Sequence, residues 1–132
     1  MPFQRPMGKI AVPEITLPEK FYRGVEQFNR QEFFEAHETL ESVWKECKTP
    51  DRIFIQGIIQ IAAGCHHFQH SNSEGARSLF YRGLAKIEPF KPVHKKVDVE
   101  MLIKATSTVL SEIESAIDSS KVVIFWPRIS IL

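Results

Sequence analysis

Apolar residues recur along this chain at helical spacing, and the pattern begins close to the N-terminus. Phe21, Val25 and Phe28 stand at positions i, i+4 and i+7, which places them on one face of a first helix. Thr16 and Glu19 have the spacing of a capping box just ahead of this apolar stripe. The residues before them read as an extended arm broken by prolines, and we expect the first helix to begin where the arm ends.

Two longer helices follow and form a predicted hairpin. Asn29 is expected to end the first helix and to cap a second one, which runs over about residues 32–47. The turn "KTPD" then leads into a third helix over about residues 51–70. This third helix is apolar on almost every side, which is typical of a helix at the centre of a bundle. Its apolar residues are Ile53, Phe54, Ile55, Ile58, Ile59, Ile61, Ala62 and Ala63.

Two further helices and an apolar tail complete the predicted organisation. A second capping box, Ser71 to Glu74, precedes a fourth helix, and Asp98 is the expected cap of a fifth. The last segment, "VVIFWPRISIL", is expected either to lie over the bundle as an extended strap or to cover a second copy of the chain. The pattern predicts a single all-α domain, a compact bundle of about five helices around a central third helix. Its parts are an extended arm at about 1–16, a helical core at 17–118 and an apolar tail at 119–132.

The charge balance and the cysteine content limit the classes of binding partner and the cellular compartment that we expect for the protein. The 132 residues carry 17 basic and 16 acidic side chains, a net charge of +1, which gives no general attraction to nucleic acid or to anionic membranes. The apolar stretch of the predicted third helix is too short and too interrupted by polar residues to span a membrane. Cys47 and Cys65 form neither a disulfide framework nor a zinc knuckle, and the N-terminus lacks the apolar run of a signal peptide. We therefore expect reduced thiols in a cytoplasmic protein.

The second helix carries polar residues on its apolar face. A helix advances about 100° per residue, which places His37 inside the arc that contains Phe33. Glu41 falls at the edge of this arc, Glu38 lies further round, and Glu35 points towards solvent. The spacing thus predicts a polar interior site in which His37 is the most buried member.

The third helix has a matching polar seam. Its members share one stripe of the helix: Arg52, Gln56, Gln60, His67 and His70. An unpaired buried polar group costs about 1–3 kcal/mol, so the seam must find partners. Because the two helices form a hairpin, we expect the seam to face the polar residues of the second helix in one connected cluster, to which a Glu41–Arg52 ion pair could contribute.

Imidazoles and carboxylates on adjacent helices are ligands for zinc, iron or manganese, and they also serve as general bases with their orienting acids. The Glu-x-x-His motif of ferritin-like proteins and the His-Glu-x-x-His motif of zincins are both absent. What remains is His37-Glu38-x-x-Glu41, whose spacing alone is a weak metal signal. His66 and His70 form a second pair, for which an exposed histidine cluster is the simpler interpretation. A purely structural network and a ligand pocket stay open as alternatives for the main seam.

These segments resemble a small all-helical family called domain of unknown function 309. The likeness rests on "FNRQEFFEAHETLESVWKE", on the helix "FIQGIIQ" and on the Gly75–Ala76 pair, and it covers about residues 17–90. The chain departs from the family at Gln31, where the family often has glycine, and this concerns the backbone of the turn. The resemblance implies a compact helical bundle, the label of a predicted metal-dependent hydrolase, and a functional site at His37, Glu38, Glu41 and Gln60.

Two hypotheses from different classes follow. In the first, the protein is a metal-dependent hydrolase of an unidentified small molecule, in which His37 and Glu41 bind a divalent ion such as zinc, manganese or iron. Glu38 and Glu41 are then the catalytic carboxylates, with Glu38 as ligand or base, and Gln60 and His67 complete the shell. In the second, the protein is a non-catalytic helical module whose seam is a packing network. In either case the apolar tail is a candidate surface for a homo-oligomer.

Overall fold

The computed structural model describes residues 16–116 and 125–132, and five α-helices account for most of this part of the chain. A short 3-10 turn, η1, spans Glu88–Phe90, and a small hairpin of β1 (Val93–His94) and β2 (Val97–Asp98) precedes the last helix. The predicted all-α bundle of about five helices is confirmed. The helices are α2 (Glu19–Asn29), α3 (Phe33–Trp44), α4 (Asp51–Gln69), α5 (Ser73–Ile87) and α6 (Val99–Ser115).

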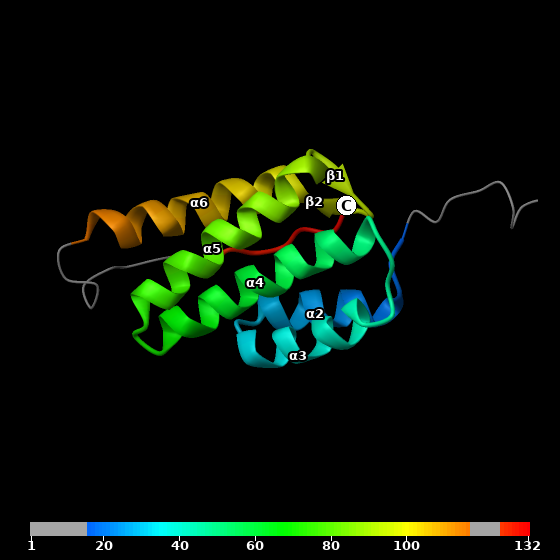
Figure 1. The fold of residues 1–132 in the computed structure, drawn as a ribbon, viewed down its shortest axis with the longest axis horizontal. Helices are drawn as coiled ribbons and strands as arrows, with labels where there is room; N and C mark the ends of the chain where they lie inside the picture. The colour runs from blue at the N-terminus through cyan, green and yellow to red at the C-terminus, as the bar shows by residue number, and fades with distance from the viewer. Residues whose placement is uncertain (1–15, 117–124) are drawn as a thin grey trace, which may run out of the picture.

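Helix α4 is the central helix, as its apolar sequence predicted. Figure 1 shows α5 and α6 on one side of it and α2 and α3 on the other. Burying one large aliphatic or aromatic side chain contributes about 1.5–3 kcal/mol, so this helix supplies a large share of the core. Its buried residues include Phe54, Ile55, Ile58, Ile61, Ala62 and Cys65. Ile53 is an exception, since it is 43% exposed.

Two glycines let α4 and α5 approach closely. A Cβ atom on Gly57 would lie 2.6 Å from Cγ2 of Ile87, and one on Gly83 would lie 2.7 Å from the carbonyl oxygen of Gly57. Separations this short are clashes, so neither position accepts a larger residue without moving the helices apart. The pair therefore fixes the distance between the two helices.

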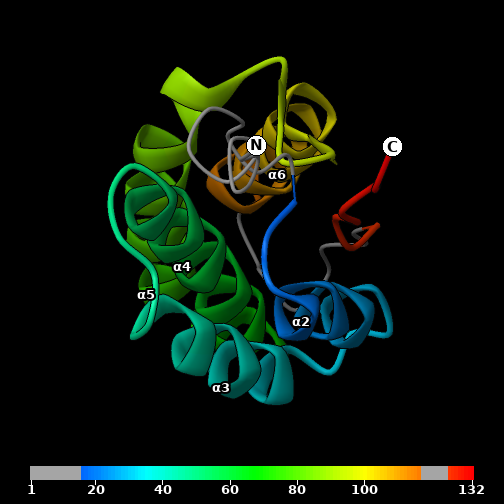
Figure 2. The ribbon, with the colours of Figure 1, turned by 90° about the vertical axis from the view of Figure 1, so that its right-hand side faces the viewer.

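The C-terminal segment closes the bundle. Figure 2 shows the helices following one another around the core, with residues 125–132 in the gap between α6 and α2. The Asn29 side chain donates to the carbonyl oxygen of Ile129 at 2.9 Å and accepts from the backbone nitrogen of Ile129 at 2.8 Å. Ile131 forms a β-bridge with Val97. These eight residues lie as the extended strap that was one of the two expectations; the rest of the predicted tail up to residue 124, and the predicted arm at 1–15, lie outside the described residues.

Several predicted caps differ from those observed. Pro18 precedes α2 without a side-chain cap, so the Thr16–Glu19 capping box is not formed. Asn29 ends α2 as predicted, but its side chain bonds to the strap instead of capping α3. Asn72, one residue after the predicted cap, accepts from Gly75 at the start of α5.

Two other local expectations concern the ends of helices. The predicted Asp98 cap is confirmed, because its carboxylate accepts from the backbone nitrogen of Met101 at 3.0 Å. Gln31 has a φ of 66°, in the left-handed region where glycine is favoured. The departure from the family thus falls on a residue whose backbone conformation explains why glycine suits the position. In the described ranges no helix has the length and apolar character to cross a membrane.

Candidate metal site

Helix α3 positions the candidate site at the edge of the core. Phe33, Ala36, Leu40 and Val43 are buried, which fixes the rotation of the helix and leaves the neighbouring face partly open. His37 on that face has a side chain that is 30% exposed, and Glu41 is also half-buried. Glu38 is exposed, at 60% for its side chain. His37 and Glu41 are therefore more buried than Glu38 and Glu35, as expected, but the site lies at the edge of the bundle and not in its interior.

The donor atoms of three α3 residues converge. His37, Glu38 and Glu41 each offer one ligand atom, and these atoms all lie within 4.8 Å of one another. Nδ1 of His37 lies 3.8 Å from Oε2 of Glu38, too far for a hydrogen bond. This nitrogen is buried and has no hydrogen-bond partner among the described residues. The group thus contains an imidazole close to two carboxylates, and one of its nitrogens, Nδ1, makes no hydrogen bond to the described part of the chain.

The donor set fits a divalent ion. Imidazole nitrogen and carboxylate oxygen are both ligands of zinc in proteins, with bonds of about 2.0–2.2 Å. Ligands of one ion are then about 3–4 Å apart, so small side-chain rotations of Glu38 and Glu41 would complete such a set. A metal bond would also satisfy the unpartnered Nδ1 of His37.

Arg52 does not join this group. Its guanidinium lies 3.8 Å from the ring centroid of Trp44, and it makes a long contact of 3.5 Å with the carbonyl oxygen of Cys47. No ion pair links it to Glu41 within the described part of the chain. Trp44 is one turn closer to the hairpin turn than Glu41, and its ring attracts the cation there. The Glu41–Arg52 pair considered from the sequence is therefore not formed.

The remaining seam residues lie along α4, and within the described residues they make no hydrogen bonds to α3. Gln56 and Gln60 are half-buried, and Oε1 of Gln60 is buried with no hydrogen-bond partner in the described ranges. The Asn72 side-chain nitrogen lies 3.1 Å from Nδ1 of His67. The His67 side chain therefore contacts the residue that caps α5, and it does not belong to the group of three. Hydrogen bonds do not join the seam into the single network that was expected.

His66 and His70 form a pair near the end of α4. Their ring centroids are 4.4 Å apart, and the His66 ring also contacts Phe34 at 5.6 Å. Burial lowers the pKa of His66, and the nearby imidazoles of His70, His67 and His37 lower it further. His66 therefore favours its neutral form, and a positive charge at His37 lowers its pKa further.

A polar groove adjoins the group of three on its α2 side. It has a volume of about 380 Å³ and is shared between the two helices. Sequence reasoning missed its α2 half, although three polar residues at i, i+3 and i+7 next to the apolar stripe of that helix are the signal that marks it. Its lining residues are Lys20, Arg23 and Gln27 from α2 with Glu38, Thr39 and Ser42 from α3.

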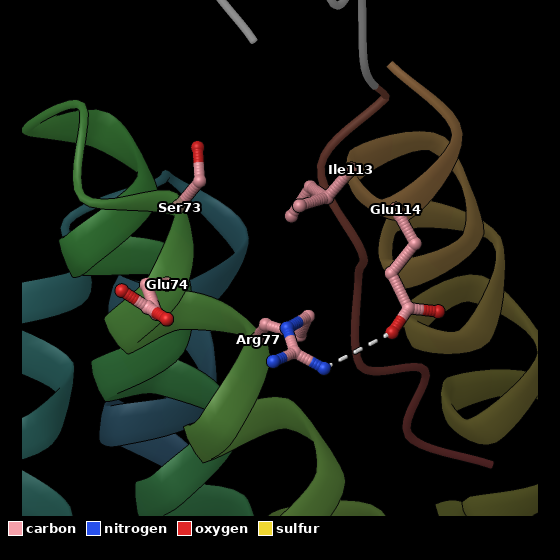
Figure 3. Close-up of a pocket in the computed structure, with 5 residues that line it drawn as sticks. All are labelled: Ser73, Glu74, Arg77, Ile113 and Glu114. Carbon is pink, nitrogen blue, oxygen red and sulfur yellow. Dashed lines mark hydrogen bonds and ion pairs between the residues drawn. The ribbon is translucent and has the colours of Figure 1, made fainter. Parts of the chain in front are cut away.

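A second cavity, of about 430 Å³, lies between α5 and α6. Figure 3 shows Arg77 and Glu114 reaching towards each other from the two helices, and their charged atoms are 3.5 Å apart. The Tyr81 hydroxyl donates to the same Glu114 carboxylate at 2.8 Å, and this bond raises the pKa of Tyr81. The central charges of this cavity are thus used to hold the two helices together.

A third polar cluster joins the start of α4 to the hairpin. Nε2 of His94 lies 2.8 Å from Oδ1 of Asp51, and Nζ of Lys95 lies 3.5 Å from Oδ2. The His94 ring also packs against Phe54 and Phe90, at centroid distances of 4.7 and 4.8 Å. Nothing in the sequence singled out His94, because it lies in a short hairpin far along the chain from its partners. The contacts make it a structural residue.

A family model described as a domain of unknown function, DUF309, matches residues 21–79. The matched range contains α3, α4 and most of α2, and therefore the whole group of His37, Glu38 and Glu41. The resemblance inferred from the sequence motifs is confirmed. The comparison with curated proteins gave no match.

Proposed function

We propose that the region matched by the DUF309 family model, residues 21–79, acts as a metal-dependent hydrolase whose ion is held by His37, Glu38 and Glu41. One observation carries the proposal: three ligand atoms, one from each side chain, lie within 4.8 Å of one another, and Nδ1 of His37 is buried without a hydrogen-bond partner among the described residues. Three protein ligands that leave a further position open are typical of catalytic rather than structural zinc sites.

The three side chains would have different roles. A bound divalent ion supplies a Lewis acid and lowers the pKa of a coordinated water. His37 and Glu41 stand one helical turn apart and are both half-buried, so packing holds them in place as ligands. Glu38 is exposed and has more freedom, which suits either a third ligand or the base that takes a proton from the attacking water. Gln60 from α4, with its unpartnered buried oxygen, is the residue proposed to complete the surroundings.

A non-catalytic helical module is the second candidate. The stacking of Arg52 on Trp44 favours it, because this contact uses one end of the polar seam for packing. A second copy of the chain is the proposed partner in that case, docked on the strap, whose first residue Phe125 is 89% exposed and whose last residue Leu132 is 63% exposed. Both candidates are proposed to work in the cytoplasm, where the free thiols of Cys47 and Cys65 would remain reduced.

Thermal melting with added metal tests the first candidate. A ligand that binds only the folded state raises the melting temperature with its concentration, so zinc, manganese or iron should stabilise protein purified without a histidine tag. The rise should shrink at acid pH, because protons compete for the ligand atoms. His37→Ala should abolish it, and His70→Ala should not.

Hydrolysis of ester substrates provides the second readout. The metal-loaded protein should cleave at least one member of a panel of phosphate and carboxylic esters, and His37→Ala should lose this activity while His70→Ala keeps it. Melting curves that do not move with any of the three metals would remove the physical basis of the hydrolase and leave the helical module.

A further inference from the structure

The groove between α2 and α3 shares Glu38 with the proposed metal site. We infer that this groove binds the phosphate group of the substrate, so that the substrate class is a small phosphorylated molecule. The inference rests on the proposed function for its position next to an ion, but the groove itself is defined by residues of α2 that take no part in the metal group.

Two cations on α2 carry the inference. Lys20 and Arg23 stand three residues apart, line the same groove and are both exposed. Neither forms an ion pair within the described ranges, in contrast to Arg77, which is held by Glu114. Arginine binds phosphate oxygens through two parallel hydrogen bonds and lysine adds a point charge, so the pair matches a dianion better than a single carboxylate.

The rest of the groove suits a polar small molecule. Oε1 of Gln27 is buried and has no hydrogen-bond partner among the described residues, so it can accept from a hydroxyl or amine of the ligand. Ser42 donates its own hydroxyl to the carbonyl oxygen of Thr39 at 2.7 Å and keeps its lone pairs for a ligand donor. A volume of about 380 Å³ lies at the small end of the range for small-molecule sites.

Glu38 makes phosphate binding depend on the metal. Without an ion, its carboxylate at the edge of the groove repels a phosphate dianion. A divalent ion on His37, Glu38 and Glu41 reverses the local charge and adds an attraction of its own. The affinities for metal and phosphate are then coupled, and each should strengthen the other by the same factor.

Calorimetric titration with inorganic phosphate, with and without manganese, tests the inference. Wild-type protein should bind phosphate about tenfold more tightly, or better, when manganese is present. The double variant Lys20→Ala/Arg23→Ala should lose about tenfold or more of the phosphate affinity and still bind manganese. Sulfate should compete for the site, and acetate should not.

The matched control removes one arginine and one lysine from another part of the surface. Arg82→Ala/Lys104→Ala, on the exposed surfaces of α5 and α6, should bind phosphate as the wild type does. Manganese binding with equal phosphate affinity in wild type and the α2 double variant would overturn the inference and leave the metal site intact. Phosphate binding that needs Lys20 and Arg23 while manganese does not bind would support the groove and refute the metal site. Binding of neither ion would refute both.

Discussion

In the described part of the chain, two histidines stand beside carboxylates, and one of the two is held in a contact that supports the fold. His94 lies 2.8 Å from Asp51, packs against two aromatic rings and holds the hairpin to the start of α4. His37 lies 3.8 Å from Glu38, and its buried Nδ1 has no hydrogen-bond partner among the described residues. The same residue types thus form a completed contact at one end of the α3–α4 hairpin and an uncompleted group along α3.

The difference separates a structural histidine from an available one. A buried polar atom without a partner costs about 1–3 kcal/mol, whereas a satisfied one contributes to stability. Removing the Asp51–His94 contact should therefore destabilise the fold, and removing His37 should not. A ligand that bonds to Nδ1 of His37 would supply the partner that the fold does not provide, and this bond would add to the binding free energy.

The largest effect is expected at the completed contact. Asp51→Ala removes the carboxylate that contacts both His94 and Lys95 and also removes an acidic residue from the first turn of α4, so the free energy of unfolding should fall by about 2 kcal/mol. Urea denaturation at neutral pH measures it. Glu41→Ala is the matched control on α3, and a loss as large as that of Asp51→Ala would contradict the contrast, since Arg52 stacks on Trp44 and does not depend on Glu41.

Two amides on α2 offer the same contrast at smaller scale. Asn29 uses both ends of its side chain to hold Ile129 of the strap, whereas Oε1 of Gln27 has no hydrogen-bond partner in the described ranges. Asn29→Ala should lower the unfolding free energy by about 1–2 kcal/mol, and Gln27→Ala should change it by less than about 0.5 kcal/mol. Equal losses in denaturant melts would show that the unpartnered amide also supports the fold.

His37→Ala should leave the metal-free protein close to wild-type stability. The variant loses some packing at the edge of the core but also removes an unsatisfied buried nitrogen, and we expect a net change within about 0.5 kcal/mol. Urea denaturation in the presence of a chelator measures it. A loss comparable to that of Asp51→Ala would place His37 with the structural histidines.

The smallest expected effect is a change in the titration of His66. Burial and the neighbouring imidazoles already hold its pKa below the ordinary value for histidine. A cation bound at His37 would disfavour the protonated form further, so the pKa of His66 should fall again when metal is added. Histidine NMR titration follows it, with His94 as the distant control. An unchanged His66 in metal-saturated protein would argue that the ion binds elsewhere.

Periodicity was enough for the helices but not for contacts between distant segments. The five helices follow from apolar residues at spacings of three and four, and α4 was recognisable as central because it has almost no polar face. The sequence does not decide between the two arrangements expected for the strap, because its position depends on contacts with Asn29 and Val97 that no local pattern encodes. The Asn72 cap differs by one residue from the predicted one because serine and asparagine compete for the same role.

For the candidate site too, positions on one helix could be predicted from the sequence, whereas contacts between helices could not. Angular positions on one helix were sufficient to bring His37, Glu38 and Glu41 together. They could not reveal that Arg52 prefers the ring of Trp44 to a carboxylate, since that choice depends on side-chain reach across the hairpin. They also missed Lys20 and Arg23, because the groove exists only once α2 has packed against α3.

Metal stoichiometry tests the central claim most directly. Untagged protein, stripped with a chelator and then dialysed against manganese or zinc, should retain about one ion per chain by elemental analysis. His37→Ala should retain none, and His70→Ala and His94→Ala should match the wild type, because neither of those residues belongs to the group on α3. Less than about a tenth of an ion per wild-type chain, or an equal load in wild type and His37→Ala, would contradict the metal site.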